Sequence, residues 1–141
     1  MTGRPNSLGQ YCINVSDLDR AVEFWSEVVG IPVQSRTEIP TAKEVVLQAD
    51  EGGSRIQLAQ QLDQDGPIDM GTALWKLYVN TSDIQALYAK AIAWGCESVM
   101  EPTHLDRWPV QMAYIKDPDG YLIELIEYDE SPPPGVPDPK A

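Results

Sequence analysis

The chain has 141 residues, a formal net charge of -12 at pH 7 and 43% hydrophobic residues. This length predicts one domain whose core is stable without disulfides or metals. Because phosphate binding needs clustered cations, the acidic balance excludes nucleic acid and anionic membrane surfaces as partners, and it is compatible with a cationic ligand.

The hydropathy pattern of the sequence predicts neither a membrane-spanning segment nor a secretory signal. No apolar run approaches the roughly 20 residues that cross a bilayer, and the first ten residues do not have the charged-then-apolar order of a secretory signal. We therefore expect a cytoplasmic protein. Cys12 and Cys96 lie far apart and are expected to be reduced thiols. His104 is the single histidine, which excludes a site built on two or more histidines of one chain.

The first half of the chain predicts a strand, a helix and three further strands after a flexible N-terminus at 1–7. "LGQYCINV" at 8–15 reads as the first strand, and Ser16 can cap the helix that follows. The helix has apolar residues at helical spacing up to Gly30. The three later strands are predicted in these segments: "IPVQSRTEI", "KEVVLQAD" and "SRIQLAQ".

The second half repeats this order after a polar linker at 61–72. "LWKLYV" is predicted as a strand and "TSDIQALYAKAIAWG" as a helix that ends at Gly95. Short strands follow at 98–101, 111–116 and 121–127, and the last two are joined by the reversal "DPDG". The proline-rich tail at 129–141 is expected to be disordered or extended.

The repeat predicts the fold class. Val15 corresponds to Val79, Gly30 to Gly95, and "SDL" to "SDI", as in a duplicated supersecondary unit. We expect an α+β domain at 8–128, made of two tandem βαβββ modules at 8–60 and 73–128.

Alternation along the strands sorts the side chains, because successive residues of a strand point to opposite faces. One set is apolar and is expected to pack against the helices: Tyr11, Ile13, Val15, Ile56, Leu58, Trp75, Leu77, Val79, Tyr121, Ile123 and Leu125. The opposite face carries Gln10, Cys12, Asn14, Arg55, Gln57, Lys76, Tyr78 and Glu124. If the sheets curl, this second set lines a cup for a small organic molecule. Alternatively, it faces open solvent on one-sided sheets.

Two segments carry a family resemblance over about residues 8–128. "INVSDLDRAVEFWSEVVGIPV" and "IKDPDGYLIELIE" resemble the first helix segment and the closing hairpin of the vicinal oxygen chelate superfamily, which includes glyoxalase, bleomycin-resistance and extradiol dioxygenase types. The resemblance implies two βαβββ modules with U-shaped half-barrel sheets and helices outside. It also implies a homodimer in which a second chain can complete the cup.

The resemblance also implies where a divalent metal ion would bind. Metal-dependent relatives take one ligand from each of four strands, and the corresponding positions here are Gln10, Gln57, Leu74 and Glu124. Leu74 offers no lone pair, so only three oxygen donors remain, a poor set for zinc, nickel or iron. We therefore expect no cofactor. If a metal is present, Gln10, Gln57 and Glu124 are its expected ligands.

Lys76 lies two residues beyond Leu74, on the same face of the predicted strand. Its ammonium could pair with Glu124 and stabilise a developing oxyanion, or the two could form a charge pair without chemistry. His104 is a candidate general base near neutral pH. Trp108 could stack on a flat ligand. Cys12 is a candidate nucleophile, although a cysteine in a strand is commonly an inert apolar residue.

Three functions are compatible with these residues. The favoured one is a metal-independent enzyme of isomerase, lyase or hydrolase type that acts on a carbonyl-bearing or aromatic substrate. Glu124, Lys76 and His104 would be catalytic, and Tyr78 and Gln57 would orient the substrate. The second is a drug-binding resistance protein without turnover. The third is a metal-dependent lyase, isomerase or dioxygenase.

Overall fold

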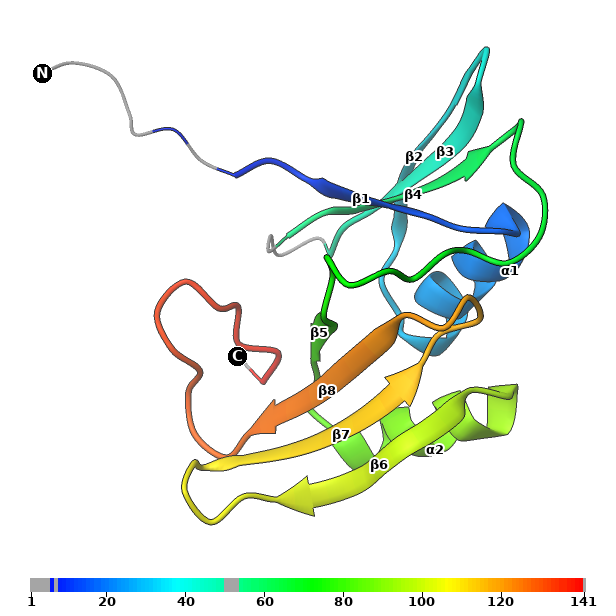
Figure 1. Cartoon of the computed structure of the whole chain (residues 1–141). Helices are drawn as coiled ribbons and strands as arrows, with labels where there is room; N and C mark the ends of the chain where they lie inside the picture. Colours follow the sequence, from blue (N-terminus) through cyan, green and yellow to red (C-terminus); the bar gives the residue numbers. More distant parts are fainter. Residues whose placement is uncertain (1–5, 7, 50–53, 141) are drawn as a thin grey trace, which may run out of the picture.

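The structure contains two four-stranded sheets, and each module also contributes a helical region (Figure 1). The computed structural model describes residue 6, residues 8–49 and residues 54–140. Most of the predicted flexible segment 1–7 and the last residue of the predicted tail therefore lie outside the described residues.

The first module contains four strands and a helix that continues as one π-helical turn. Its elements are β1 (Tyr11–Asn14), α1 (Leu18–Glu23), η1 (Phe24–Val28), β2 (Val33–Ile39), β3 (Ala42–Leu47) and β4 (Ile56–Gln61). The strand order is β1-β4-β3-β2, and β1 pairs in parallel with β4. The other two pairings are antiparallel, as expected for strands joined by short turns.

The second module repeats this arrangement. Its elements are β5 (Leu77–Asn80), α2 (Ile84–Trp94), β6 (Glu97–His104), β7 (Val110–Lys116) and β8 (Leu122–Tyr128). The strand order β5-β8-β7-β6 matches that of the first sheet, with β5 parallel to β8. The predicted α+β fold of two βαβββ modules is confirmed.

Both helices begin at an aspartate. Asp17 accepts a hydrogen bond from Arg20 N at 3.2 Å, and Asp83 accepts one from Ala86 N at 3.0 Å. The prediction that Ser16 caps the first helix is wrong, because Asp17 does so. The second helix ends at Gly95, whose φ of 118° is in the left-handed region that favours glycine.

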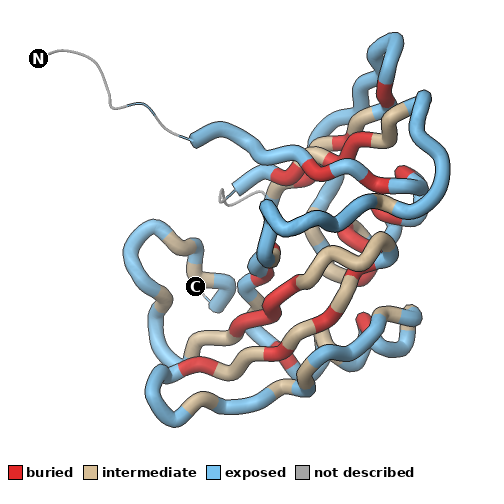
Figure 2. The backbone as a smooth tube through the Cα atoms, in the orientation of Figure 1, coloured by how far each residue is buried: buried red, intermediate tan, exposed pale blue. Residues whose placement is uncertain are grey.

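The core lies where the apolar strand faces meet the helices (Figure 2). Ile13, Leu58, Ile123 and Leu125 are buried at alternate strand positions, as predicted. Tyr11 was expected among them but is 44% exposed. Trp75 was also expected to pack and is 75% exposed, because β5 begins only at Leu77 and the strand alternation does not extend back to it.

Contacts between the helices join the two modules. The Phe24 and Trp94 ring centroids are 5.6 Å apart, and Trp94 Nε1 donates to Glu23 Oε1 at 2.9 Å. The guanidinium of Arg20 lies 4.4 Å from the centroid of the Trp94 ring. Trp94 therefore links α2 to both helical segments of the first module.

The turn between β7 and β8 makes a second link between the modules. Asp119 accepts hydrogen bonds from Ser16 N at 3.2 Å and Ser16 Oγ at 2.5 Å. Tyr121 Oη donates to the Asn14 carbonyl at 2.6 Å. Gly120 has a φ of 99°, so the reversal predicted from "DPDG" is present. The turn thus holds the end of β1.

Replacing Asp119 with alanine is expected to weaken this link. The variant loses two hydrogen bonds to a carboxylate that is partly exposed, and we expect the free energy of unfolding to fall by about 1 kcal/mol. Urea denaturation of Asp119→Ala and Asp119→Asn measures the effect. The asparagine variant retains one acceptor oxygen and should lose less; equal stability of all three proteins would contradict the link.

Asp117, at the start of the same turn, is a buried carboxylate with only one oxygen satisfied. Its Oδ1 accepts from Asp119 N at 2.9 Å and from Tyr121 N at 2.8 Å, whereas its Oδ2 is buried without a hydrogen-bond partner among the described residues. Burial raises the pKa of Asp117 from 3.8 to about 6. The folded state therefore binds the proton more tightly than the unfolded state.

This raised pKa fixes the sign of a pH effect on stability. As the pH rises from about 4 through 6, Asp117 ionises and the protein loses stability. Asp117→Asn removes the charge and keeps an acceptor oxygen. The stability difference between variant and wild type should therefore shift by about 1–2 kcal/mol in favour of the variant between pH 4 and pH 7. Guanidinium denaturation at both pH values measures it, and a pH-independent difference would contradict it.

Candidate functional site

Lys76, Tyr114 and Glu124 form a closed triangle of hydrogen bonds. Lys76 Nζ donates to Glu124 Oε1 at 2.5 Å and to Tyr114 Oη at 3.1 Å. Tyr114 Oη in turn donates to Glu124 Oε1 at 2.7 Å. The predicted pairing of Lys76 with Glu124 is therefore present.

Strand register brings the three residues together. Glu124 lies opposite Tyr78 on β5 and opposite Tyr114 on β7, so these three side chains share one face of the second sheet. Lys76 enters from the segment directly before β5. The predicted common face for Lys76, Tyr78 and Glu124 is thus confirmed within the second module.

The pair is buried under aromatic rings. The side chains of Lys76 and Glu124 are 8% and 6% exposed. Lys76 Nζ lies 4.0 Å from the ring centroid of Trp75, 5.0 Å from that of Tyr78 and 5.3 Å from that of Tyr114. The rings of Trp75 and Tyr78 are themselves largely exposed and form the outer side of the site.

The surroundings keep Lys76 positively charged. Burial alone lowers the pKa of Lys76, but its interactions with Glu124, Tyr114 and Tyr78 outweigh burial and raise that pKa above its usual value. The pKa of Tyr114 is also raised, first by burial and then by its hydrogen bond to Glu124. Near neutral pH the site therefore contains an ammonium and a protonated phenol.

Glu124 offers one oxygen without a hydrogen bond. Both bonds to its carboxylate end on Oε1, and none from a described residue reaches Oε2. Among the contacts of the described residues, one carboxylate oxygen is therefore held by two donors and the other by none.

Gln10, Gln57 and Glu44 form a separate polar set in the first module. Gln10 Nε2 donates to Gln57 Oε1 at 2.7 Å, and Gln57 Nε2 donates to Glu44 Oε2. Cys12 lies opposite Gln57 in the β1–β4 register. Burial and the nearby Glu44 carboxylate raise the pKa of Cys12, which makes its thiolate scarce.

The common cup expected from strand alternation stays a prediction for the single chain. None of the hydrogen bonds or ion pairs between described residues joins the Gln10–Gln57 set to Glu124, and each four-stranded sheet contains the strands of one module. A hollow of about 410 Å³ lies between the end of β1 and the linker at 63–69. Of the predicted site residues only Asn14 lines it, and Asn14 Oδ1 accepts from Gln61 Nε2 at 3.0 Å.

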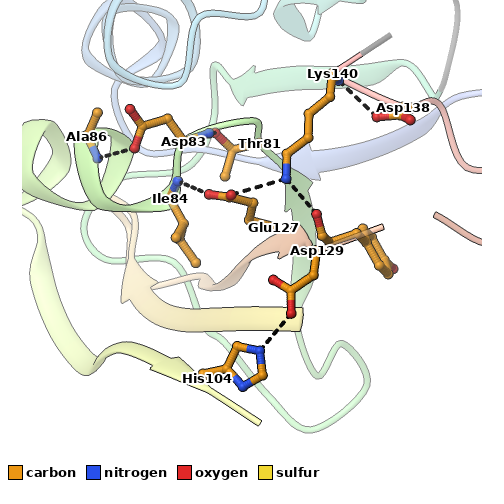
Figure 3. A network of polar contacts seen from close by, with 10 residues as sticks. Thr81, Asp83, Ile84, Ala86, His104, Glu127, Asp129, Asp138 and Lys140 are labelled. Atoms are coloured by element: carbon orange, nitrogen blue, oxygen red, sulfur yellow. Dashed lines mark hydrogen bonds and ion pairs between the residues drawn. The ribbon is translucent and has the colours of Figure 1, made fainter. Parts of the chain in front are cut away.

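His104 lies at the end of β6, where it pairs with Gln111, whereas Glu124 pairs with Tyr114 further along the hairpin. Figure 3 shows His104 beside Asp129. Its Nε2 is 2.7 Å from Asp129 Oδ2, and both side chains are substantially exposed. Nearby, Lys140 Nζ donates to the Tyr128 carbonyl and lies 3.2 Å from Glu127 Oε2. The structure therefore does not bring His104 to the other predicted catalytic residues.

Trp108 and Arg55 are also outside the triangle. Trp108 is exposed in the loop between β6 and β7, where its ring faces the guanidinium of Arg107 at 4.7 Å. Arg55 is exposed directly before β4. Neither makes a described contact with Lys76 or Glu124.

Sequence reasoning missed Tyr114, Trp75 and Glu44 as members of these clusters. Tyr114 lies opposite Glu124 because the hairpin pairs Lys116 with Leu122, whereas the predicted turn at 117–120 would pair Lys116 with Tyr121 and place Ile123 opposite Tyr114. Trp75 was misplaced by extending β5 too far toward the N-terminus. Nothing in the local pattern distinguished Glu44 from other exposed strand carboxylates.

The metal site implied by the fold does not fit these residues as they are arranged in one chain. The ammonium of Lys76 holds the Glu124 carboxylate, Leu74 provides no donor atom, and the amides of Gln10 and Gln57 bind each other and Glu44. Among the described residues, no three histidine, cysteine, aspartate or glutamate side chains come together as a metal-binding group.

Removing the cation of the buried Lys76–Glu124 pair is expected to destabilise the protein. Lys76→Met leaves the Glu124 carboxylate buried without its cation, and we expect it to lower the free energy of unfolding by about 3 kcal/mol. The control is Lys116→Met, since Lys116 forms an exposed 3.4 Å pair with Glu97 in the same sheet. Chemical denaturation compares them, and similar losses in both variants would contradict a special role for the buried pair.

Comparison with known proteins agrees with this fold. Residues 7–125 match the family model described as the Glyoxalase/Bleomycin resistance protein/Dioxygenase superfamily. The chain is 30% identical over 119 residues to a probable lactoylglutathione lyase of Vibrio parahaemolyticus, covering 82% of this chain and 86% of that protein. It is also 30% identical to lactoylglutathione lyase GLX1 of Arabidopsis thaliana, covering 85% of this chain and 44% of that protein. The chain thus spans less than half the length of the plant relatives that it matches.

Solved structures show the same fold. A glyoxalase family protein from Bacillus cereus superimposes with a TM-score of 0.78 at 20% identity, over 89% of this chain and 96% of that one. The trypanothione-dependent glyoxalase I of Leishmania major gives a TM-score of 0.73 at 23% identity, over 86% and 87% of the two chains. Together with the family match, these findings show that the chain belongs to the glyoxalase/bleomycin resistance protein/dioxygenase superfamily.

Proposed function

We propose that the chain is an isomerase- or lyase-type enzyme that performs metal-independent acid/base chemistry on a small carbonyl-bearing substrate. One observation carries the proposal: Glu124 is held through Oε1 by Lys76 and Tyr114, while its Oε2 accepts no hydrogen bond from a described residue. A carboxylate base and a fixed positive charge thus lie side by side. The names of the relatives, which are lactoylglutathione lyases, support the lyase or isomerase class.

The proposed reaction is a proton transfer next to a carbonyl group. Glu124 Oε2 removes a proton from the carbon beside the carbonyl, and the electron pair of the broken C–H bond moves onto the carbonyl oxygen. The ammonium of Lys76 donates a hydrogen bond to the resulting enolate oxygen. In a substrate with a hydroxyl group on that carbon, the hydroxyl proton passes to the enolate oxygen, and Glu124 returns its proton to the former carbonyl carbon. This completes an isomerisation without an external oxidant or reductant.

Burial strengthens both roles. A positive charge close to the developing oxyanion acts more strongly where water is excluded, and the Lys76 side chain is only 8% exposed. Tyr114 fixes the carboxylate so that Oε2 keeps its direction. Tyr78 and Trp75 provide exposed rings beside the pair, against which a flat or apolar part of the substrate can pack.

The test uses the hemithioacetal of methylglyoxal and glutathione, the precursor of lactoylglutathione, as a probe substrate. Uptake of solvent deuterium at the substrate carbon, followed by proton NMR in the presence of EDTA, reports proton abstraction without metal. We expect Glu124→Gln to reduce the exchange rate at saturating substrate by roughly 100-fold or more, and Lys76→Met by a similar factor.

Exposed counterparts in the same sheet provide matched controls. Glu97→Gln and Lys116→Met change the same residue types outside the site and should leave the exchange rate within about twofold. Loss of exchange on adding EDTA, together with stoichiometric metal tied to Glu124, would overturn metal independence. Exchange in the wild type that Glu124→Gln leaves unchanged would overturn the assigned base.

A second candidate function is ligand binding without turnover, as in a drug-binding resistance protein. The exposed Trp75 and Tyr78 rings beside a buried charge favour it, because such rings hold ligands without reacting. The two functions differ in kinetics. In a binder, changes at Lys76 or Glu124 alter affinity alone, whereas in an enzyme they reduce turnover at saturating substrate.

Dimerisation would bring the two polar sets together. The Gln10–Gln57–Glu44 set and the Lys76–Tyr114–Glu124 triangle lie on different sheets of one chain, so a second chain is the proposed means of completing a cup. A homodimer in sedimentation analysis that Tyr78→Asp disrupts would support this arrangement.

A further inference from the structure

The side chains around Lys76 have the composition of a binding site for a positively charged nitrogen. Three aromatic rings, those of Trp75, Tyr78 and Tyr114, have centroids within 5.3 Å of Lys76 Nζ, and the Glu124 carboxylate is 2.5 Å from it. Aromatic faces attract cations through their negative quadrupole, and an adjacent carboxylate adds a full charge. This arrangement would hold any ammonium of suitable size.

We propose that Trp75, Tyr78, Tyr114 and Glu124 form a binding site for the ammonium group of an organic ligand, and that Lys76 occupies this site until such a ligand displaces it. Lys76 thus acts as a resident substitute for the ligand cation. This inference goes beyond the proposed function and does not depend on turnover.

The position of Lys76 in the chain permits the displacement. Lys76 precedes the first residue of β5, and among described residues the segment from Ala73 to Lys76 has no strand pairing. The ammonium is tied to the site by side-chain contacts alone, so it can leave without breaking the sheet. The other members are fixed more firmly, since Tyr114 and Glu124 lie opposite each other within the β7–β8 ladder.

The outer rings leave the site open to solvent. Trp75 is 75% exposed and Tyr78 is 58% exposed, so a ligand can reach the site by moving two surface side chains. The net charge of -12 favours the approach of cations over anions. A ligand with its own ammonium would satisfy Glu124 in place of Lys76, so the displacement leaves no buried carboxylate unpaired.

The probe for this site is tetramethylammonium chloride, compared with sodium chloride at equal ionic strength. Lys76→Ala empties the site, and we expect tetramethylammonium to raise the melting temperature of this variant with a saturable dependence on concentration. The unaltered chain should bind the probe roughly tenfold more weakly, because the cation must first displace Lys76. Lys116→Ala, which changes an exposed lysine of the same sheet, should behave like the unaltered chain.

A double variant distinguishes the contribution of the carboxylate to binding from that of the rings. Adding Glu124→Gln to Lys76→Ala leaves the three rings but removes the charge, and it should weaken tetramethylammonium binding several-fold. Equal stabilisation of Lys76→Ala by sodium and tetramethylammonium would overturn the proposal. Equal affinity of the Lys76→Ala and Lys116→Ala proteins for tetramethylammonium would also overturn it.

If Lys76→Ala does not fold, the displacement of Lys76 can be tested on the unaltered chain. Brief treatment with N-hydroxysuccinimidyl acetate acetylates accessible lysines, and mass spectrometry measures each site. Tetramethylammonium should increase acetylation of Lys76 several-fold relative to Lys116, because the displaced side chain becomes accessible. Acetylation of Lys76 that stays constant or falls, at a probe concentration that leaves Lys116 unaffected, would overturn the displacement. Neither readout involves catalysis, so failure of the proposed enzyme function would be distinguishable from failure of this site.

Discussion

A carboxylate buried in the middle of a strand must be compensated, and this constraint organises the site. Glu124 lies between the core residues Ile123 and Leu125 and is itself only 4% exposed. An isolated ionised carboxylate in such surroundings would be strongly destabilising. The compensation comes from Lys76 and Tyr114, which lie before β5 and on the neighbouring β7. Three segments of the second module are thereby coupled through one oxygen atom.

That coupling also explains why the site departs from the metal-binding arrangement that the fold allows. An ammonium on the carboxylate supplies a positive charge with hydrogen-bond directions of its own, so Glu124 does not need a divalent ion for charge balance. Leu74 offers no donor atom, and the chemistry that we propose for this face is proton transfer and cation binding. Membership of the superfamily establishes the scaffold; the reaction has to be argued from the side chains that the scaffold positions.

The two modules carry different polar surfaces, and the fold places these two surfaces on separate sheets of one chain. The turn at Asp119 and the contacts of Trp94 fix the end of β1 and the two helical regions against each other. The amide network of Gln10 and Gln57 then belongs to one sheet and the charged triangle to the other. A ligand that uses both surfaces has to bridge the modules or meet them across a chain interface.

The sequence by itself determined the fold class, most strand and helix positions and the face to which Glu124 belongs. These follow from local rules: alternation in strands, helical spacing, and the turn chemistry of "DPDG". The pairing of Lys76 with Glu124 was within its reach because both positions share a predicted face. The triangle with Tyr114, the exposure of Trp75 and the separation of His104 were decided by tertiary structure. Each depends on where a strand begins, how the hairpin is registered and which segments pack side by side, and long-range packing sets these where local periodicity gives no signal.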